Sequence, residues 1–354
     1  MRPREERRLR PERLAWVDRV VACFALAMMA AFPATRASAQ DPAPHAIDIP
    51  PWFATSFLDF RDEVAEAARN GRRVMLYVGQ DGCPYCTKLM TANFSQGDIV
   101  AKTRAGFVAI ALDLWGDRET TWTDGTVASE KALAARLDVR FTPTLLFLDE
   151  AGNVVVRLDG YWPPRRFGAV LDYVAAKAES REPLADWLAR TAKEPSRAAR
   201  AAEPFLLRPP YDFARRTGAR PLAVIFESPD CDACDEMHRE AFRRADVRAE
   251  LARVDVASLS IGAATPVTTP RGRATTARAW ARELGVAYTP SVVFFDASGT
   301  EVFRIGAYLR PFHFASSFAY VADAGYRDEP SFQRWLRARA DRMRAQGKRV
   351  EVWE

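Results

Sequence analysis

A stretch whose apolar residues have helical spacing is followed by short continuous apolar runs, and this order occurs twice along the chain. In the first copy, a stretch with helical spacing (57–70) precedes a short apolar run (74–78), and a second apolar run lies at 107–114. Helical spacing predicts an amphipathic helix, and short apolar runs predict buried strands. We therefore predict a helix and two strands in each copy. The corresponding stretches of the second copy are 211–216, 222–226 and 253–259.

The rest of each copy follows one plan as well. A polar stretch leads into a helix (130–137; 277–284), and a Thr-Pro dipeptide then starts a strand hairpin that a closing helix follows. This order predicts an α/β fold in which helices flank a mixed sheet. Trp187 and Trp335 lie in a further helix of each copy, where we expect them to anchor the core.

The spacing of matching residues indicates a duplication. Cysteines and Thr-Pro dipeptides recur at offsets of 148 and 147 residues: Cys83 as Cys231, Cys86 as Cys234, Thr142-Pro143 as Thr289-Pro290. We predict two tandem domains, at 50–190 and 205–354, with a linker at 191–204 that is rich in Ala, Arg and Pro.

The first 39 residues have the features of a secretory signal peptide. A basic segment precedes thirteen apolar residues (20–32), and Ala37-Ser38-Ala39 supplies the small residues of a cleavage site before Gln40. The apolar run is shorter than the ~20 residues that span a bilayer, so we expect no stable membrane insertion after cleavage. An uncleaved anchor is the alternative. The sequence thus predicts a periplasmic protein.

Removal of this segment changes the meaning of the charge. The whole chain has a formal net charge of +5, and the segment carries eight Lys/Arg and four Asp/Glu, which leaves +1. A nearly neutral chain gives no indication of nucleic-acid binding.

The first Cys-x-x-Cys pair has a redox-active pattern. Cys83 follows a predicted strand and opens a helix, where free backbone N–H groups and the helix dipole stabilise a thiolate. Pro84 suits the first helical turn. We predict Cys83 as the nucleophile and Cys86 as the resolving thiol. A static disulfide, or a zinc site shared with the distant second pair, are the alternatives.

The second pair, Cys231 and Cys234, has acidic surroundings. Four carboxylates flank it: Asp230, Asp232, Asp235 and Glu236. Negative charge disfavours a thiolate, so we predict that this pair is the more reducing one and passes electrons to Cys83 and Cys86. The alternative is a degenerate copy kept for packing.

The recurring Thr-Pro dipeptides support redox chemistry. A proline at the start of an apolar strand removes a ladder hydrogen bond, and its recurrence in both copies predicts a cis peptide near each Cys pair. The three histidines are scattered and suggest no metal cluster, and we predict no metal and no cofactor.

Together these residues resemble the thioredoxin superfamily, in particular the SoxW-type and related secreted bacterial thioredoxin-like proteins. The resemblance covers nearly all of 50–180 and, more weakly, 205–325. It implies two tandem thioredoxin-like domains with catalytic cysteines, and substrate-binding residues in the Cys-Pro-Tyr-Cys and Thr-Pro segments. The residues implied to be catalytic are Cys83, Cys86, Cys231 and Cys234, and those implied to bind substrate are Pro84, Tyr85, Thr142, Pro143, Thr289 and Pro290.

The chain departs from the thioredoxin pattern at two positions in each copy. Gly82 and Asp230 stand where thioredoxins have a tryptophan, and Tyr77 and Ile225 stand where they bury an acid. Proton removal from the resolving cysteine must then depend on water or on another group.

The resemblance implies a periplasmic thiol–disulfide oxidoreductase that reduces disulfides of exported proteins. Because the periplasm lacks a thiol buffer, a membrane thiol–disulfide donor would have to re-reduce it. A disulfide oxidase or isomerase is one alternative. Another is a non-catalytic binding module that uses the polar insertions at 115–129 and 260–276. Copper delivery is disfavoured because only His238 lies near a Cys pair.

Overall fold

The computed structural model describes residues 46–192, 203–215, 218–229 and 231–350. The predicted signal peptide (1–39) and most of the predicted linker (191–204) lie outside the described residues. We call the part up to residue 192 the first repeat and the part from residue 203 the second repeat.

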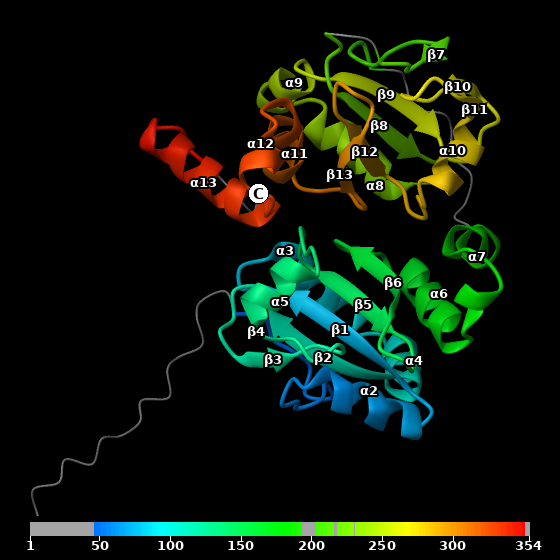
Figure 1. The fold of residues 1–354 in the computed structure, drawn as a ribbon, viewed down its shortest axis with the longest axis vertical. Helices are drawn as coiled ribbons and strands as arrows, with labels where there is room; N and C mark the ends of the chain where they lie inside the picture. Colours follow the sequence, from blue (N-terminus) through cyan, green and yellow to red (C-terminus); the bar gives the residue numbers. More distant parts are fainter. Residues whose placement is uncertain (1–45, 193–202, 216–217, 230, 351–354) are drawn as a thin grey trace, which may run out of the picture. The chain divides into compact units, whose positions relative to one another are not determined.

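The first repeat is built on a four-stranded mixed sheet with the order β2-β1-β5-β6. Its central strand β1 is buried along its whole length, pairs with β2 in parallel and pairs with β5 antiparallel (Figure 1). Alternate side chains of β1 belong to two different hydrophobic clusters, so the sheet has a core on each face. The strands are β1 (Arg73–Gly79), β2 (Phe107–Asp113), β5 (Thr144–Leu148) and β6 (Val154–Asp159).

Helices cover both faces of this sheet (Figure 1). Helix α2 begins where the side chain of Asp59 accepts a hydrogen bond from the N–H of Arg61, and it buries Phe60, Val64 and Ala67. The helical segments are α2 (Phe60–Arg69), α3 (Pro84–Lys88), η2 (Leu89–Asn93), α4 (Gly97–Gly106), α5 (Glu130–Arg136), α6 (Pro164–Ala175), η3 (Ala178–Ser180) and α7 (Leu184–Thr191).

The second repeat has the same topology, with the sheet order β13-β12-β8-β9. The strands are β8 (Leu222–Glu227), β9 (Asp255–Ser260), β12 (Ser291–Phe295) and β13 (Glu301–Ile305). The helical segments are α8 (Asp232–Glu236), η4 (Met237–Ala241), α9 (Ala245–Leu251), α10 (Ala277–Glu283), α11 (Pro311–Ala322), α12 (Gly325–Asp328) and α13 (Phe332–Ala345). The predicted α/β fold, a mixed sheet flanked by helices in each copy, is confirmed.

The polar insertions form short hairpins, and one predicted helix is wrong. The insertions contain β3 (Glu119–Thr121) with β4 (Val127–Ser129), and β10 (Pro266–Thr268) with β11 (Ala274–Thr276). The helix predicted at 211–216 is instead a strand at its start, β7 (Tyr211–Asp212), which pairs in parallel with β10. This pairing joins residues about 56 apart in sequence, and a six-residue helical pattern cannot report it.

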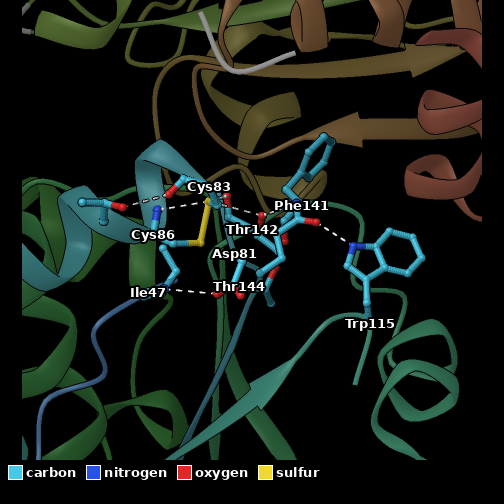
Figure 2. The surroundings of a disulfide bond; sticks show 10 residues. Ile47, Asp81, Cys83, Cys86, Trp115, Phe141, Thr142 and Thr144 are labelled. Carbon is cyan, nitrogen blue, oxygen red and sulfur yellow. Dashed lines mark hydrogen bonds between the residues drawn. A yellow bond between two sulfur atoms is a disulfide. The ribbon is translucent and has the colours of Figure 1, made fainter. Parts of the chain in front are cut away.

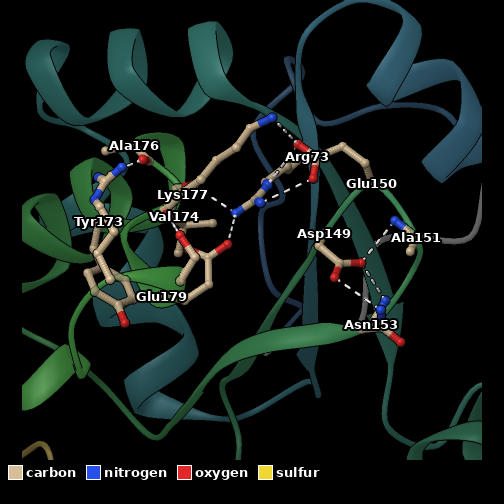
Figure 3. Close-up of polar contacts among 12 residues, drawn as sticks. Arg73, Asp149, Glu150, Ala151, Asn153, Tyr173, Val174, Ala176, Lys177 and Glu179 are labelled. Carbon is tan, nitrogen blue, oxygen red and sulfur yellow. Dashed lines mark hydrogen bonds and ion pairs between the residues drawn. The ribbon is translucent and has the colours of Figure 1, made fainter.

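A buried arginine fastens the start of β1 to two other segments (Figure 3). The guanidinium of Arg73 binds both carboxylate oxygens of Glu150 at 3.1 Å, and it also binds Glu179 at 2.7 Å and the carbonyl of Val174 at 2.9 Å. Lys177 adds a second cation on Glu150 at 2.8 Å. These contacts hold the hairpin between β5 and β6 against the end of α6.

The two tryptophans behave as the sequence predicts. Trp335 is buried in the core of the second repeat, and Trp187 packs against the core of the first repeat and donates from its indole to the carbonyl of Ala169. Among the described residues, every helix is too short or too polar to cross a membrane.

Candidate redox site

The first Cys pair lies at the start of α3 and is joined by a disulfide (Figure 2). Cys83 caps the helix, and its Sγ accepts a hydrogen bond from the N–H of Cys86 at 3.1 Å. Pro84 occupies the first turn of the helix, as predicted. The backbone therefore offers Sγ of Cys83 a donor that stabilises negative charge on this sulfur.

The predicted Thr-Pro loop contacts this sulfur. The peptide bond between Thr142 and Pro143 is cis, as its recurrence predicts, and the carbonyl oxygen of Thr142 lies 3.3 Å from Sγ of Cys83. The hydroxyl of Thr142 also lies 3.4 Å from this sulfur. The structure thus brings Thr142 of this loop to the Cys83–Cys86 pair.

Two residues that the sequence did not single out complete a chain of hydrogen bonds. The indole N–H of Trp115 donates to Oε1 of Gln80 at 2.7 Å, and Nε2 of Gln80 donates to the hydroxyl of Thr142 at 3.0 Å. With its oxygen accepting from Gln80, the Thr142 hydroxyl points its hydrogen toward Cys83. Each group donates to the next, and the last donor, the hydroxyl of Thr142, donates to the sulfur of Cys83. This series of hydrogen bonds therefore favours a thiolate at Cys83.

Tyr85 is partly buried beside the Cys pair. Its ring stacks on Tyr161 with centroids 6.4 Å apart, and Lys88 lies 4.7 Å above the ring of Tyr161. Burial raises the pKa of Tyr85, so its phenol stays neutral near physiological pH. The predicted substrate-binding residues Pro84, Tyr85 and Thr142 line a small cavity, and residues of the second repeat complete its lining: Leu309, Arg310, His313 and Gln333.

The second Cys pair has the same backbone arrangement. Cys231 caps α8, is joined to Cys234 by a disulfide, and accepts from the N–H of Cys234 at 3.1 Å. The peptide bond between Thr289 and Pro290 is cis. Ser228 takes the place of Gln80, and its hydroxyl lies 2.9 Å from that of Thr289.

The charges around the second pair differ from those around the first. Asp232 and Asp235 lie in the first turn of α8, where the first repeat has Pro84 and Thr87. Glu236 ends α8, where the first repeat has Lys88 at the end of α3. Burial, with Glu240 nearby, raises the pKa of Glu236. The second pair is therefore in a more acidic environment.

Within the described ranges, no group of three or more His, Cys, Asp or Glu side chains is arranged to hold a metal ion. The four cysteines of the described residues form two separate disulfides, one in each repeat, instead of the four-cysteine zinc site that was an alternative.

Comparison with known proteins agrees with this geometry. A family profile described as thioredoxin-like domain matches residues 60–175 and 212–322. No curated protein sequence matches the chain.

The solved structures that the chain matches include three bacterial proteins. The chain is similar to a thioredoxin-fold protein from Helicobacter pylori (14% identity, TM-score 0.32), with 36% of this chain and 84% of that chain covered. It is similar to a thioredoxin from Thermus thermophilus (29%, TM-score 0.28; 34% and 85% covered). It is also similar to a disulphide isomerase from Xylella fastidiosa (14%, TM-score 0.26; 38% and 98% covered).

Proposed function

Because the chain belongs to the thioredoxin-like domain family and holds a Cys-x-x-Cys disulfide in each repeat, it is a thiol–disulfide oxidoreductase, and we propose that it reduces disulfides of exported proteins in the periplasm. The observation that carries the proposal is the set of donors on Sγ of Cys83, from the N–H of Cys86 and the hydroxyl of Thr142.

The reaction is a dithiol–disulfide exchange. The thiolate of Cys83 attacks one sulfur of the partner's disulfide, which forms a mixed disulfide and releases one partner thiolate. Cys86, after losing its proton, attacks Sγ of Cys83 and releases the second partner sulfur as a thiolate. The partner gains two electrons, and the Cys83–Cys86 pair loses them.

The chain then needs a source of electrons. We propose that Cys231 and Cys234 pass two electrons to Cys83 and Cys86, and that a membrane thiol–disulfide donor reduces the second pair. The acidic surroundings of Cys231 support this direction, because a destabilised thiolate makes the disulfide form of a pair harder to reduce.

Reduction potentials test the direction. Each pair is equilibrated with a series of dithiothreitol ratios in a chain whose other pair is changed to serine. Values near the ~−270 mV of thioredoxin support a reductase, with the Cys231–Cys234 pair the more negative. Values near the ~−120 mV of strong periplasmic oxidants would instead indicate a disulfide oxidase.

The proposed location has its own test. Residues 1–39 are fused to a reporter enzyme that is active only after export, and the secreted chain itself is sequenced from its amino terminus. We expect export and a mature chain that begins at Gln40. A reporter that stays inactive would overturn the periplasmic assignment.

A further inference from the structure

The buried space next to each Cys pair is filled differently in the two repeats. In the first repeat, a Cβ on Gly79 would overlap the hydroxyl of Tyr77, so this phenol occupies the space that the side chain of residue 79 would otherwise fill. At the corresponding positions, four and six residues before the first cysteine, the second repeat has Glu227 and Ile225. At these two positions the second repeat therefore has a carboxylate, and the first repeat has a phenol.

Two more polar side chains meet at this carboxylate, and a third contacts one of them. Nε2 of His238 lies 3.1 Å from each carboxylate oxygen of Glu227, and its Nδ1 lies 3.4 Å from Oε1 of Glu203. The hydroxyl of Ser258 donates to Oε1 of Glu227 at 3.0 Å. Glu203 and Glu227 are only 8% and 7% exposed, so two carboxylates and an imidazole are held largely away from water.

The polar residues of this cluster replace less polar ones as a set. Strand register places Ser258 beside Ile225, where the first repeat has Ala111 beside Tyr77. His238 stands four residues after Cys234, where the first repeat has Met90 after Cys86. The first repeat packs the corresponding region without these polar groups, and burying ionisable groups costs free energy. A copy kept only for packing does not explain the cluster.

Residues of the cluster lie close in sequence to the second Cys pair, one before Cys231 and one after Cys234. Glu227 ends β8, four residues before Cys231. His238 follows Cys234 by four residues in the helical segment that α8 and η4 form. His238 therefore lies about one helical turn after Cys234 in the same helical segment.

We propose that the Glu227–His238 pair exchanges a proton with Cys234 during thiol–disulfide exchange, an inference that rests on the proposed function. The thiolate of Cys231 attacks a disulfide and forms a mixed disulfide, which releases one partner thiolate. The Sγ–H of Cys234 gives its proton to the pair, and the resulting thiolate attacks Sγ of Cys231. The second partner sulfur leaves as a thiolate and takes the proton from the pair.

Charged groups face His238 from two other segments. Glu227 faces it from β8 and Glu203 from the segment before β7, with Arg243 3.9 Å from Glu203. The two carboxylates offer oxygen atoms that can accept a proton, and the imidazole that contacts both can pass it on.

The test isolates the second pair in the full chain. Cys83 and Cys86 are changed to serine, as is Cys23, the fifth cysteine of the chain, which lies in the predicted signal peptide. The reduced protein is mixed with an aromatic disulfide whose released thiolate is coloured. The first phase of colour reports attack by Cys231, and the second phase reports resolution by Cys234. We expect Glu227→Gln to slow the second phase about tenfold or more at neutral pH, to leave the first unchanged, and to lose its effect in alkali, where hydroxide removes the proton.

A second variant and a matched control guard against misfolding. His238→Met copies the first repeat and is expected to slow the second phase in the same way. The control is Glu227→Gln in a chain that keeps Cys83 and Cys86 but lacks Cys231 and Cys234, where both phases are expected to be unchanged.

The outcomes separate this inference from the proposed function. An unchanged second phase in both variants, or equal slowing of both phases at every pH, would overturn the proton exchange and leave the redox function standing. Absence of colour with either pair of the unmodified chain would overturn both.

Discussion

The two Cys pairs have the same backbone geometry and differ in the side chains that surround them. In both repeats the Cα atoms of the pair lie 5.2 Å apart and the N–H of the second cysteine lies 3.1 Å from the first sulfur. Beyond this frame, Gln80 and Trp115 extend a donor chain to Cys83, whereas acidic residues follow Cys234 in the second repeat. The fold fixes the geometry of the two pairs, and we propose that the side chains set the direction of exchange.

The largest expected effect comes from removing one nucleophile at a time. Cys83→Ser should abolish reduction of a protein disulfide, because this sulfur makes the attack. Cys231→Ser should leave one turnover of the pre-reduced chain intact and abolish only repeated turnover. Stopped-flow assays of a single turnover, compared with steady-state assays, measure both.

The opposite result would reverse the comparison. If Cys231→Ser abolishes the single turnover and Cys83→Ser spares it, the second pair meets the substrate and electrons flow from the first pair to the second.

A smaller effect is expected from neutralising the acids of α8. Asp232→Asn combined with Asp235→Asn should raise the reduction potential of the Cys231–Cys234 pair toward that of the first pair, because less negative charge opposes a thiolate at Cys231. A change of about 30 mV corresponds to about 1.4 kcal/mol. Equilibration with dithiothreitol measures it.

A carboxylate elsewhere in the same repeat serves as the control for this change. Asp328→Asn removes an exposed charge from α12 and should leave the potential unchanged. Equal shifts from both changes would mean that total charge, and not the local environment of Cys231, sets the potential.

Local patterns in the sequence predicted most of the fold. The strands around Leu76 and Val224 are short apolar runs, and the helix after Asp59 has a regular apolar face, so each was evident from neighbouring residues. The helix predicted at 211–216 was wrong because the first two residues of this segment pair with β10, which is distant in sequence.

The candidate site was predictable only where its residues are adjacent in sequence. The Cys-x-x-Cys and Thr-Pro pairs are short motifs and were found. Gln80 and Trp115 were missed because their hydrogen bonds span 62 and 35 residues. The role of His238 depends on Glu227 and Glu203, 11 and 35 residues before it, so only the folded chain brings these groups together.

Gln80→Leu should lower the thiolate population at Cys83, because it breaks the series of hydrogen bonds from Trp115 to Thr142. Loss of one buried hydrogen bond is worth about 1 kcal/mol, which corresponds to a roughly fivefold lower thiolate population at Cys83 near neutral pH. The rate of alkylation of Cys83 by iodoacetamide, measured against pH in a Cys86→Ser chain, reports this population.

The second repeat supplies the matched variant for this prediction. Ser228→Ala removes the corresponding contact to Thr289, which joins two hydroxyl groups, whereas Gln80 donates from an amide that also accepts from the indole of Trp115. The effect of Ser228→Ala on Cys231 should therefore be smaller. Equal effects in the two repeats would mean that the Trp115–Gln80 extension adds nothing.

The smallest effect concerns stability, at a turn where the repeats also differ. Glu150 binds Arg73 and Lys177, which lower its pKa from the ordinary 4.5 to about 2, whereas the corresponding turn residue of the second repeat is Ala297. A lowered carboxylate pKa stabilises the fold above pH 4.5, and this stabilisation is lost as the pH falls toward 2. Because the Glu150 side chain is 37% exposed, solvent screening limits the effect of Glu150→Gln to about 0.5 kcal/mol.

Urea unfolding of the Glu150→Gln variant at a series of pH values checks this contribution. The difference from the unchanged chain should be constant from pH 7 down to about 5 and should shrink below that, as the carboxylate begins to bind a proton in the unfolded chain. In an Arg73→Met background the same substitution should have a smaller effect at every pH, because only Lys177 still binds Glu150. A difference that stays constant down to pH 3 would mean that Glu150 acts through packing, and the two turns would then differ in shape alone.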